Sequence, residues 1–179
     1  SRGRLVPTAS RRGATSTAGD KVLVIGCGPL GLGTILTFKA FGFTAIYAVD
    51  PSPERLALAR EFGAEAYDAG AETEQREGEF AIVIEASGSA QGRKTALYAV
   101  EPGGAFVVLG ESNDPFVIQP TPRLRRKDFH MIRSFYFDLN EVPDNIALYR
   151  NNQQSFQRLV SKVVPFEQLE HTFVEFCQA

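Results

Sequence analysis

The chain has 179 residues, of which 44% are hydrophobic and 22% are charged, so it can bury the core of one domain. Lys and Arg (19) nearly balance Asp and Glu (21), and a net charge of −2 gives no reason to expect a nucleic-acid partner. No apolar run approaches the roughly 20 residues that span a bilayer, which indicates a soluble chain with no membrane partner. Two cysteines cannot form a disulfide framework, which favours a reducing, cytoplasmic location.

Residues 1–18 differ from the rest because they are rich in Arg and Ser and contain no acidic residue. We interpret them as a linker or weakly ordered lead-in, with a transit peptide as the alternative. Met131 is the only methionine, so we expect the sequence to be a processed product or a piece of something longer.

Strand-like and helix-like segments alternate after this lead-in. The continuous apolar run Val22–Ile25 is typical of a strand buried on both faces of a parallel sheet. Further strands are predicted at 45–49, 65–67, 80–86, 105–109, 131–137 and 159–164. Helices are predicted at 30–41, from Ser52 to Gly63, around 95–100, at 144–150 and at 166–176. This alternation predicts an α/β fold over 19–150: a doubly wound, mostly parallel Rossmann sheet with helices on both faces.

The segment Gly26-Cys27-Gly28-Pro29-Leu30-Gly31 follows the first strand and opens the first helix. Gly26 permits a tight turn, Gly28 lets a pyrophosphate approach the main chain, and Gly31 lets the helix pack closely on the strand. The N–H groups at the start of the helix then face the phosphates. We interpret Cys27 as a small apolar loop residue rather than a reactive thiol.

An acidic residue ends the second strand. Asp50 follows Gly26 by 24 positions, and a carboxylate there can accept hydrogen bonds from the adenosine ribose and repel a 2′-phosphate. The spacing therefore favours NAD over NADP as the cofactor. The alternative is that Asp50 only caps the turn before Ser52, and Arg55 lies near enough to reach either the ribose or a 2′-phosphate.

Four ordered blocks of the sequence read KVLVIGCGPLG, AVDPSPERLALAREFGAE, VIEASG and PGGAFVVLG. They resemble the medium-chain dehydrogenase/reductase superfamily, above all its zinc-type alcohol, sorbitol and threonine dehydrogenases, and the likeness covers about 19–176. It implies an NAD-binding domain in which Leu30 packs behind the nicotinamide. The cofactor-binding residues predicted from the motif and the resemblance are Gly26, Gly28, Pro29, Leu30, Gly31, Asp50, Arg55, Ser87, Gly88, Leu109, Gly110, Ser134 and Phe135.

The resemblance also implies what is absent. Family enzymes begin with a large domain that supplies the zinc ligands and most of the substrate pocket, and no such segment is present. We therefore expect zinc only in that absent catalytic domain, no catalytic residue and no metal ligand in this chain, and no turnover by the chain alone. Residues 151–179 resemble sequence that normally packs on the missing domain.

Other features have competing interpretations. The basic run Arg123, Arg125, Arg126 and Lys127 is predicted to be solvated or to lie at an oligomer edge. Glu85, near the end of a strand, is either a buried carboxylate satisfied by backbone donors or a functional one. His130 and His171 are interpreted as packing or surface residues. An edge strand at 131–137 would need covering, which suggests a homodimer.

The sequence thus predicts the NAD(H)-binding domain of a zinc-type medium-chain alcohol or polyol dehydrogenase, which positions the nicotinamide for hydride transfer with a small alcohol or carbonyl substrate. Two alternatives stay open. One is a non-catalytic module that senses a dinucleotide or binds a partner. The other is an S-adenosylmethionine-dependent methyltransferase, against which the third glycine, Gly31, and the Pro102-Gly103-Gly104 turn argue.

Overall fold

A six-stranded sheet forms the centre of the molecule. The computed structural model describes residues 16–69, 76–134 and 138–178. In these residues the strand order is β3-β2-β1-β4-β5-β6, and every neighbouring pair is parallel. The strands are β1 (Val22–Ile25), β2 (Ile46–Asp50), β3 (Glu65–Asp68), β4 (Phe80–Glu85), β5 (Val100–Val108) and β6 (His130–Arg133). The predicted doubly wound Rossmann sheet is confirmed.

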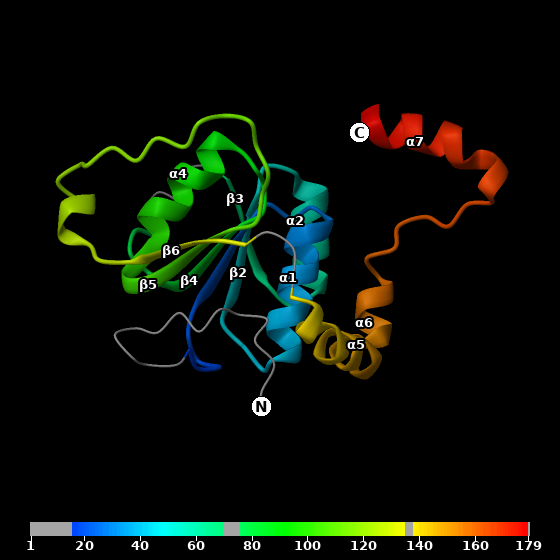
Figure 1. The fold of residues 1–179 in the computed structure, drawn as a ribbon, viewed down its shortest axis with the longest axis horizontal. Coiled ribbons are helices and arrows are strands. Elements are labelled where there is room, and N and C mark those ends of the chain that lie inside the picture. Colours follow the sequence, from blue (N-terminus) through cyan, green and yellow to red (C-terminus); the bar gives the residue numbers. More distant parts are fainter. Residues whose placement is uncertain (1–15, 70–75, 135–137, 179) are drawn as a thin grey trace.

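Helices cover both faces of this sheet (Figure 1). The helices are α1 (Pro29–Ala40), α2 (Pro53–Glu61), α4 (Ala90–Ala99), α5 (Val142–Asn151), α6 (Gln153–Gln157) and α7 (Leu169–Gln178). Short 3₁₀ turns are η1 (Leu124–Arg126), η2 (Leu139–Glu141) and η3 (Phe166–Gln168). The helices α1 and α2 pack on one face with residues such as Ile35 and Leu56, whereas α4 packs on the other with Leu97. Two apolar layers therefore hold the sheet between them.

The strands and helices follow from local sequence signals. All four residues of β1 are buried, as expected for a central strand covered on both faces. The helix α2 begins where Pro53 fixes the first turn and the Ser52 Oγ accepts a hydrogen bond from the Arg55 N–H at 3.3 Å. The predicted start of this helix is confirmed.

The chain reverses direction across the sheet at its centre. From β1 it winds outward through β2 and β3, and it then returns to place β4 on the other side of β1. In open parallel sheets, ligands bind where the carboxyl ends of two such strands diverge. By this rule a ligand would bind beyond Ile25 and Glu85, the last residues of β1 and β4, which pair with each other.

One boundary and one whole strand differ from the prediction. The helix expected around 95–100 ends at Ala99, and Val100 already begins β5, which continues through the Pro102-Gly103-Gly104 segment with a register shift against β4. The strand predicted at 159–164 is wrong, because these residues form no regular structure and the described sheet ends at β6. Leu159 instead packs beside the α1–α2 layer, and an apolar side chain used in this way mimics a strand residue in the sequence.

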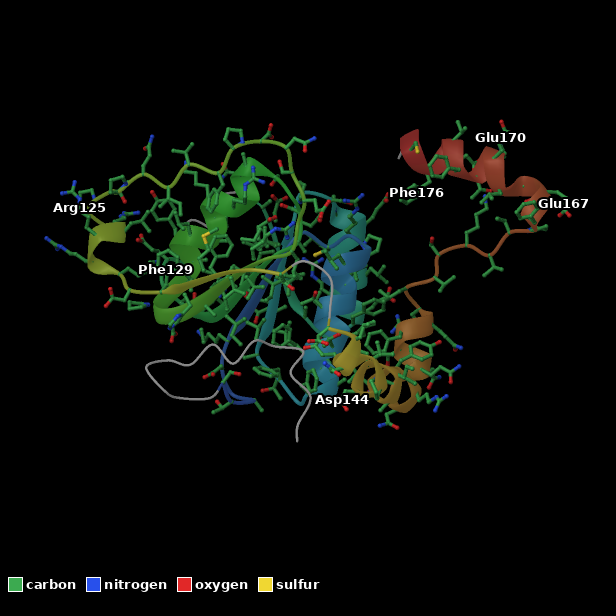
Figure 2. All side chains as sticks on the ribbon, viewed as in Figure 1. Arg125, Phe129, Asp144, Glu167, Glu170 and Phe176 are labelled. Atoms are coloured by element: carbon green, nitrogen blue, oxygen red, sulfur yellow. The ribbon has the colours of Figure 1, made fainter. Side chains whose placement is uncertain are left out.

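The last helix stands away from the sheet. Figure 2 shows Phe176 and Glu170 on α7, far from the strands, with Glu167 at the turn before it. The residues Phe166 and Phe176 are 83% and 73% exposed. The tail from 160 to 178 therefore adds little to the core in this structure.

Candidate dinucleotide-binding site

The glycine motif forms the turn between β1 and α1, and each glycine has its own geometric reason. Gly26 adopts φ +92°, and a Cβ there would lie 2.7 Å from the backbone nitrogen of Ser87. A Cβ at Gly31 would lie 1.8 Å from the carbonyl oxygen of Gly26. A Cβ at Gly28 would meet no atom within 4 Å. The protein's own packing thus explains Gly26 and Gly31, whereas Gly28 faces open space in which a ligand could approach the main chain.

The first turn of α1 has N–H groups without intrahelical acceptors, as at every helix start. Pro29 occupies the first position, and the N-cap Gly28 supplies no side-chain hydrogen bond. The helices α2 and α4, by contrast, are capped by the hydroxyls of Ser52 and Ser89. The start of α1 is the one of these three that can offer its N–H groups and its dipole to an anion. Leu30 lies beside it with its side chain half exposed.

Asp50 joins the end of β2 to the glycine turn. Its side chain is only 3% exposed, and its two oxygens accept hydrogen bonds from the Cys27 N–H at 2.7 Å and the Ser52 N–H at 2.8 Å. The carboxylate therefore does cap the turn before Ser52, as one interpretation held. Each oxygen still has a further lone pair that a ribose hydroxyl could use. Arg55 is exposed on the first turn of α2.

Cys27 is a packing residue. Its side chain is fully buried and joins the α1–α2 apolar layer. Burial raises the pKa of the thiol to about 12, and the Asp50 carboxylate adds to this rise, while Arg55 opposes it. The thiolate is therefore essentially absent at neutral pH, which agrees with the interpretation of Cys27 as a small apolar loop residue.

A single buried residue, Glu85, organises the loops after β4 and β5. The Oε1 of Glu85 accepts hydrogen bonds from the Ser87 N–H at 2.7 Å, the Ser87 hydroxyl at 2.6 Å and the Gly88 N–H at 2.8 Å. Its backbone carbonyl accepts from the N–H groups of Leu109 at 2.8 Å and Gly110 at 2.9 Å. Oε2 has no hydrogen-bond partner among the described residues. Four predicted cofactor residues are thus positioned by Glu85, whose role the sequence left open.

The two loops also touch directly. Gly88 adopts φ +68°, and a Cβ there would lie 2.2 Å from the Glu111 carbonyl oxygen. A Cβ at Gly110 would lie 2.2 Å from the Gly88 nitrogen. The ends of β4 and β5 are thereby held as one unit.

The end of β6 completes this edge. The Ser134 N–H donates to the Val108 carbonyl at 3.1 Å, which places Ser134 beside the end of β5. Phe135 lies outside the described residues. Arg133, which the sequence analysis did not single out, reaches across from β6: its Nη1 donates to the carbonyls of Val108 at 3.1 Å, Leu109 at 3.4 Å and Ser134 at 2.9 Å. The available signal was a charged residue, Arg133, within the predicted strand 131–137.

Most of the residues predicted to bind a cofactor lie at the same edge of the sheet. The glycine turn, Asp50, the Ser87–Gly88 loop, Leu109, Gly110 and Ser134 all follow the carboxyl ends of the parallel strands, at one edge of the sheet. Their grouping across several strands supports an elongated ligand along this edge.

Other features of the described residues do not belong to this edge. A hollow of about 330 Å³ lies between α4 and the loop at 115–124, and none of the predicted cofactor residues lines it. No group of three His, Cys, Asp or Glu side chains able to hold a metal ion occurs in 16–69, 76–134 or 138–178. Within the same residues, no helix is both long and apolar enough to cross a membrane.

Comparison with known proteins agrees with this geometry. The chain is 38% identical over 179 residues to sorbitol dehydrogenase of Rattus norvegicus, with 92% of this chain and 48% of that protein covered. It is 32% identical over 176 residues to a protein of Arthroderma otae named as a D-xylulose reductase A, covering 92% of this chain and 49% of that one. The alcohol dehydrogenase TADH from Thermus sp. ATN1 superposes with a TM-score of 0.74 at 29% identity, over 89% of this chain and 49% of that chain.

The chain spans about half the length of the relatives it matches. Residues 29–151 match the sequence model of the family described as Zinc-binding dehydrogenase. That match begins in the glycine turn and extends through the last residue of α5, so it includes most of the sheet and of the edge described above. The chain belongs to the zinc-binding dehydrogenase family and corresponds to its nucleotide-binding domain.

Proposed function

We propose that this chain is the NAD(H)-binding part of a zinc-type polyol or alcohol dehydrogenase and that it orients the nicotinamide for hydride transfer. The observation that carries the proposal is the open space at Gly28, next to the uncapped start of α1. The names of the sorbitol and xylulose relatives favour a small polyol or its ketone as the substrate of the complete protein.

Different residues of this site would bind different parts of the dinucleotide. The N–H groups of Leu30 and Gly31, at the positive end of the α1 dipole, would bind the pyrophosphate where Gly28 admits it. Asp50 would accept hydrogen bonds from the adenosine ribose. Leu30 and the loops ending β4, β5 and β6 would hold the nicotinamide. When bound, the nicotinamide ring supplies the carbon that accepts or gives up a hydride.

Asp50 supports NAD over NADP. Its carboxylate is buried and fixed by two N–H groups, so it cannot swing away from a 2′-phosphate. The negative charge of the Asp50 carboxylate would repel the negative charge of a 2′-phosphate bound next to it. Arg55 is exposed on the next helix and is the residue that would moderate this preference. We expect NADH to bind more tightly than NADPH, and Asp50→Ala to narrow the difference.

The reaction needs more than these residues. The catalytic zinc and most of the substrate pocket would come from the remaining half of a dehydrogenase of the relatives' length. For the chain alone we expect dinucleotide binding that is micromolar or weaker, and no turnover. We also propose a homodimer that forms through the edge strand β6, where Met131 is 44% exposed. The free thiols of Cys27 and Cys177 support a further proposal, a reducing, cytoplasmic location.

The decisive experiment compares Gly28→Ala with Gly33→Ala by isothermal titration with NADH. Gly28 has an ordinary backbone (φ −72°) and room for a methyl group, so Gly28→Ala should fold normally. That methyl group would occupy the surface needed by the pyrophosphate, and we expect binding weakened about tenfold or more. A Cβ at Gly33, in the same helix, would make only an ordinary contact at 3.7 Å with Leu159, so Gly33→Ala should bind NADH like the wild type.

Equal affinity of the two variants would contradict the proposed pyrophosphate site. Thermal shifts with NADH, NADPH and S-adenosylmethionine separate the remaining alternatives. A rise in melting temperature with the methyl donor alone would identify a methyltransferase. NADH binding combined with no zinc-ligand residues in the sequence adjoining this chain would favour a dinucleotide-sensing module.

A further inference from the structure

The hollow between α4 and the loop at 115–124 has a volume of about 330 Å³. Its walls are mostly apolar, and they include Leu97 of α4, Phe116 and Val117 of the loop, and Leu124 of η1. A hollow of this size is within the range of pockets that bind small molecules, and such pockets combine apolar walls with a few placed polar groups. The polar groups of this hollow therefore indicate the kind of molecule that it could bind.

Arg93 of α4 lines the hollow and is only 4% exposed. Its Nη1 donates to the Gly88 carbonyl at 3.2 Å and its Nη2 to the Asp114 carbonyl at 3.4 Å, while its Cζ lies 5.8 Å from the centre of the Phe116 ring. All of these partners are uncharged. Within the described residues Arg93 forms no ion pair, and its Nε has no hydrogen-bond partner. Arg93 is thus a buried cation without a counter-ion in the part of the chain that the structure describes.

A buried charge is normally paired, because its removal from water costs more free energy than neutral partners return. The guanidinium of Arg93 cannot avoid this cost by losing its proton. Lys94, the next residue of α4, is exposed and adds a second cation to the wall of the hollow, and the described lining contains no acidic residue. The electrostatics of this hollow therefore favour an anion, whereas its apolar walls favour an uncharged body.

We propose that this hollow is a second ligand site, which binds a small carboxylate with an apolar body, such as an aryl acid or a short-chain acid. The carboxylate would supply the negative charge that Arg93 lacks, with Lys94 beside it, and the body would pack against Leu97 and Phe116. Inorganic anions do not use the apolar walls, and neutral molecules leave the charge of Arg93 uncompensated. The inference does not rest on the proposed function, because none of the predicted cofactor residues that the structure describes lines the hollow.

The test titrates the 179-residue chain at low salt with benzoate and, as its uncharged counterpart of the same shape, with benzamide. We expect benzoate to bind and benzamide to bind about tenfold more weakly or worse, because only benzoate carries the negative charge. Equal affinities for the two, or no binding of benzoate, would overturn the inference.

Two leucine substitutions test the location of the ligand. Ala90 is an exposed residue at the start of α4 that lines the hollow, so Ala90→Leu should fill part of the space and weaken benzoate binding about tenfold or more. Ala57 is an exposed alanine of α2 outside the lining, and Ala57→Leu is the matched control that should bind benzoate like the wild type. Wild-type affinity in Ala90→Leu would show that benzoate binds elsewhere. Competition between benzoate and NADH would place it at the dinucleotide edge, whereas failure of NADH to bind would overturn only the proposed function.

Charge removal tests the role of the two cations. Arg93→Met should reduce the affinity for benzoate to about that for benzamide, and a folded Arg93→Met that binds benzoate like the wild type would overturn the inference. Lys94→Gln should weaken benzoate binding about threefold at low salt and less at high salt, because the ammonium group is exposed. Lys162→Gln removes an exposed lysine of the tail and should leave the affinity unchanged. If Arg93→Met does not fold, equal benzoate affinity in Lys94→Gln and Lys162→Gln at low salt overturns the inference.

Discussion

The body of the protein and its tail use apolar residues in opposite ways. From Val22 to Val108 the large hydrophobic side chains are mostly buried, and Phe80 and Phe106 have no exposed surface. From Leu139 onward many residues of the same kind are exposed, among them Phe166, Phe173 and Phe176, whereas Phe156 and Leu159 are partly buried against the α1–α2 layer. Most of the apolar surface that is buried on folding therefore lies in the body, whereas the large apolar side chains of α7 are mainly exposed. A sheet that is covered by helices on both faces can thus be followed by a segment, here α7, whose apolar side chains are not buried against it.

The largest expected effect comes from matched phenylalanine truncations. Phe106→Ala removes a fully buried ring from the layer between β5 and α4, and we expect the free energy of unfolding to fall by about 3–5 kcal/mol. Phe176→Ala removes a ring that is 73% exposed and should change it by less than about 0.5 kcal/mol. Urea denaturation measures both. A cost for Phe176→Ala close to that of Phe106→Ala would show that α7 packs on the body in solution.

Truncation of the tail at two places sharpens the comparison. Removal of 165–179 deletes η3 and α7, and we expect a loss of less than about 1 kcal/mol, because the described side chains of that segment are mainly exposed. Removal of 152–179 also deletes Phe156 and Leu159, which pack on the α1–α2 layer, and Arg158, which lies over the Phe62 ring. That larger deletion should cost about 2 kcal/mol more. Identical melting temperatures for the two truncated proteins would contradict a boundary near Leu159.

The smallest expected effect concerns Lys127, a partly buried cation beside the end of α4. Lys127 Nζ donates to the carbonyls of Tyr98 at 2.9 Å and Val100 at 2.6 Å, at the carboxyl end of α4. We expect Lys127→Met to lower the free energy of unfolding by about 1 kcal/mol at neutral pH, through loss of these contacts. Arg126→Met, which removes an exposed charge next to it, is the control and should have little effect.

The pH dependence of Lys127 has a defined sign. Burial lowers the pKa of its ammonium group below the ordinary 10.5, so the folded state binds this proton less tightly than the unfolded state. The cost of burying the charge is present at neutral pH and is relieved as the pH rises from the lowered pKa towards 10.5. The stability of the wild type relative to Lys127→Met should therefore increase over that alkaline range. A constant difference between the two would exclude the burial of this charge as a contributor.

The sequence predicted what depends on neighbours along the chain. The glycine turn, the Ser52 cap and the buried run of β1 each follow from a few adjacent residues, and the parallel order follows from their alternation. The dual role of Glu85 could not be predicted, because its backbone carbonyl meets Leu109 and Gly110 only once β5 lies beside β4. Arg133 was missed for the same reason. The strand at 159–164 was predicted from apolar residues, but a strand also needs a neighbouring edge to pair with.

The contact between Gly88 and Gly110 constrains how this family member can diverge. The backbone of each turn occupies the space that a side chain on the facing turn would need. Neither Gly88 nor Gly110 can therefore be replaced by a residue with a side chain unless the facing turn moves. Mutational libraries aimed at cofactor choice should therefore vary the two turns together. A single replacement at either glycine would misfold, so its effect on cofactor specificity could not be selected.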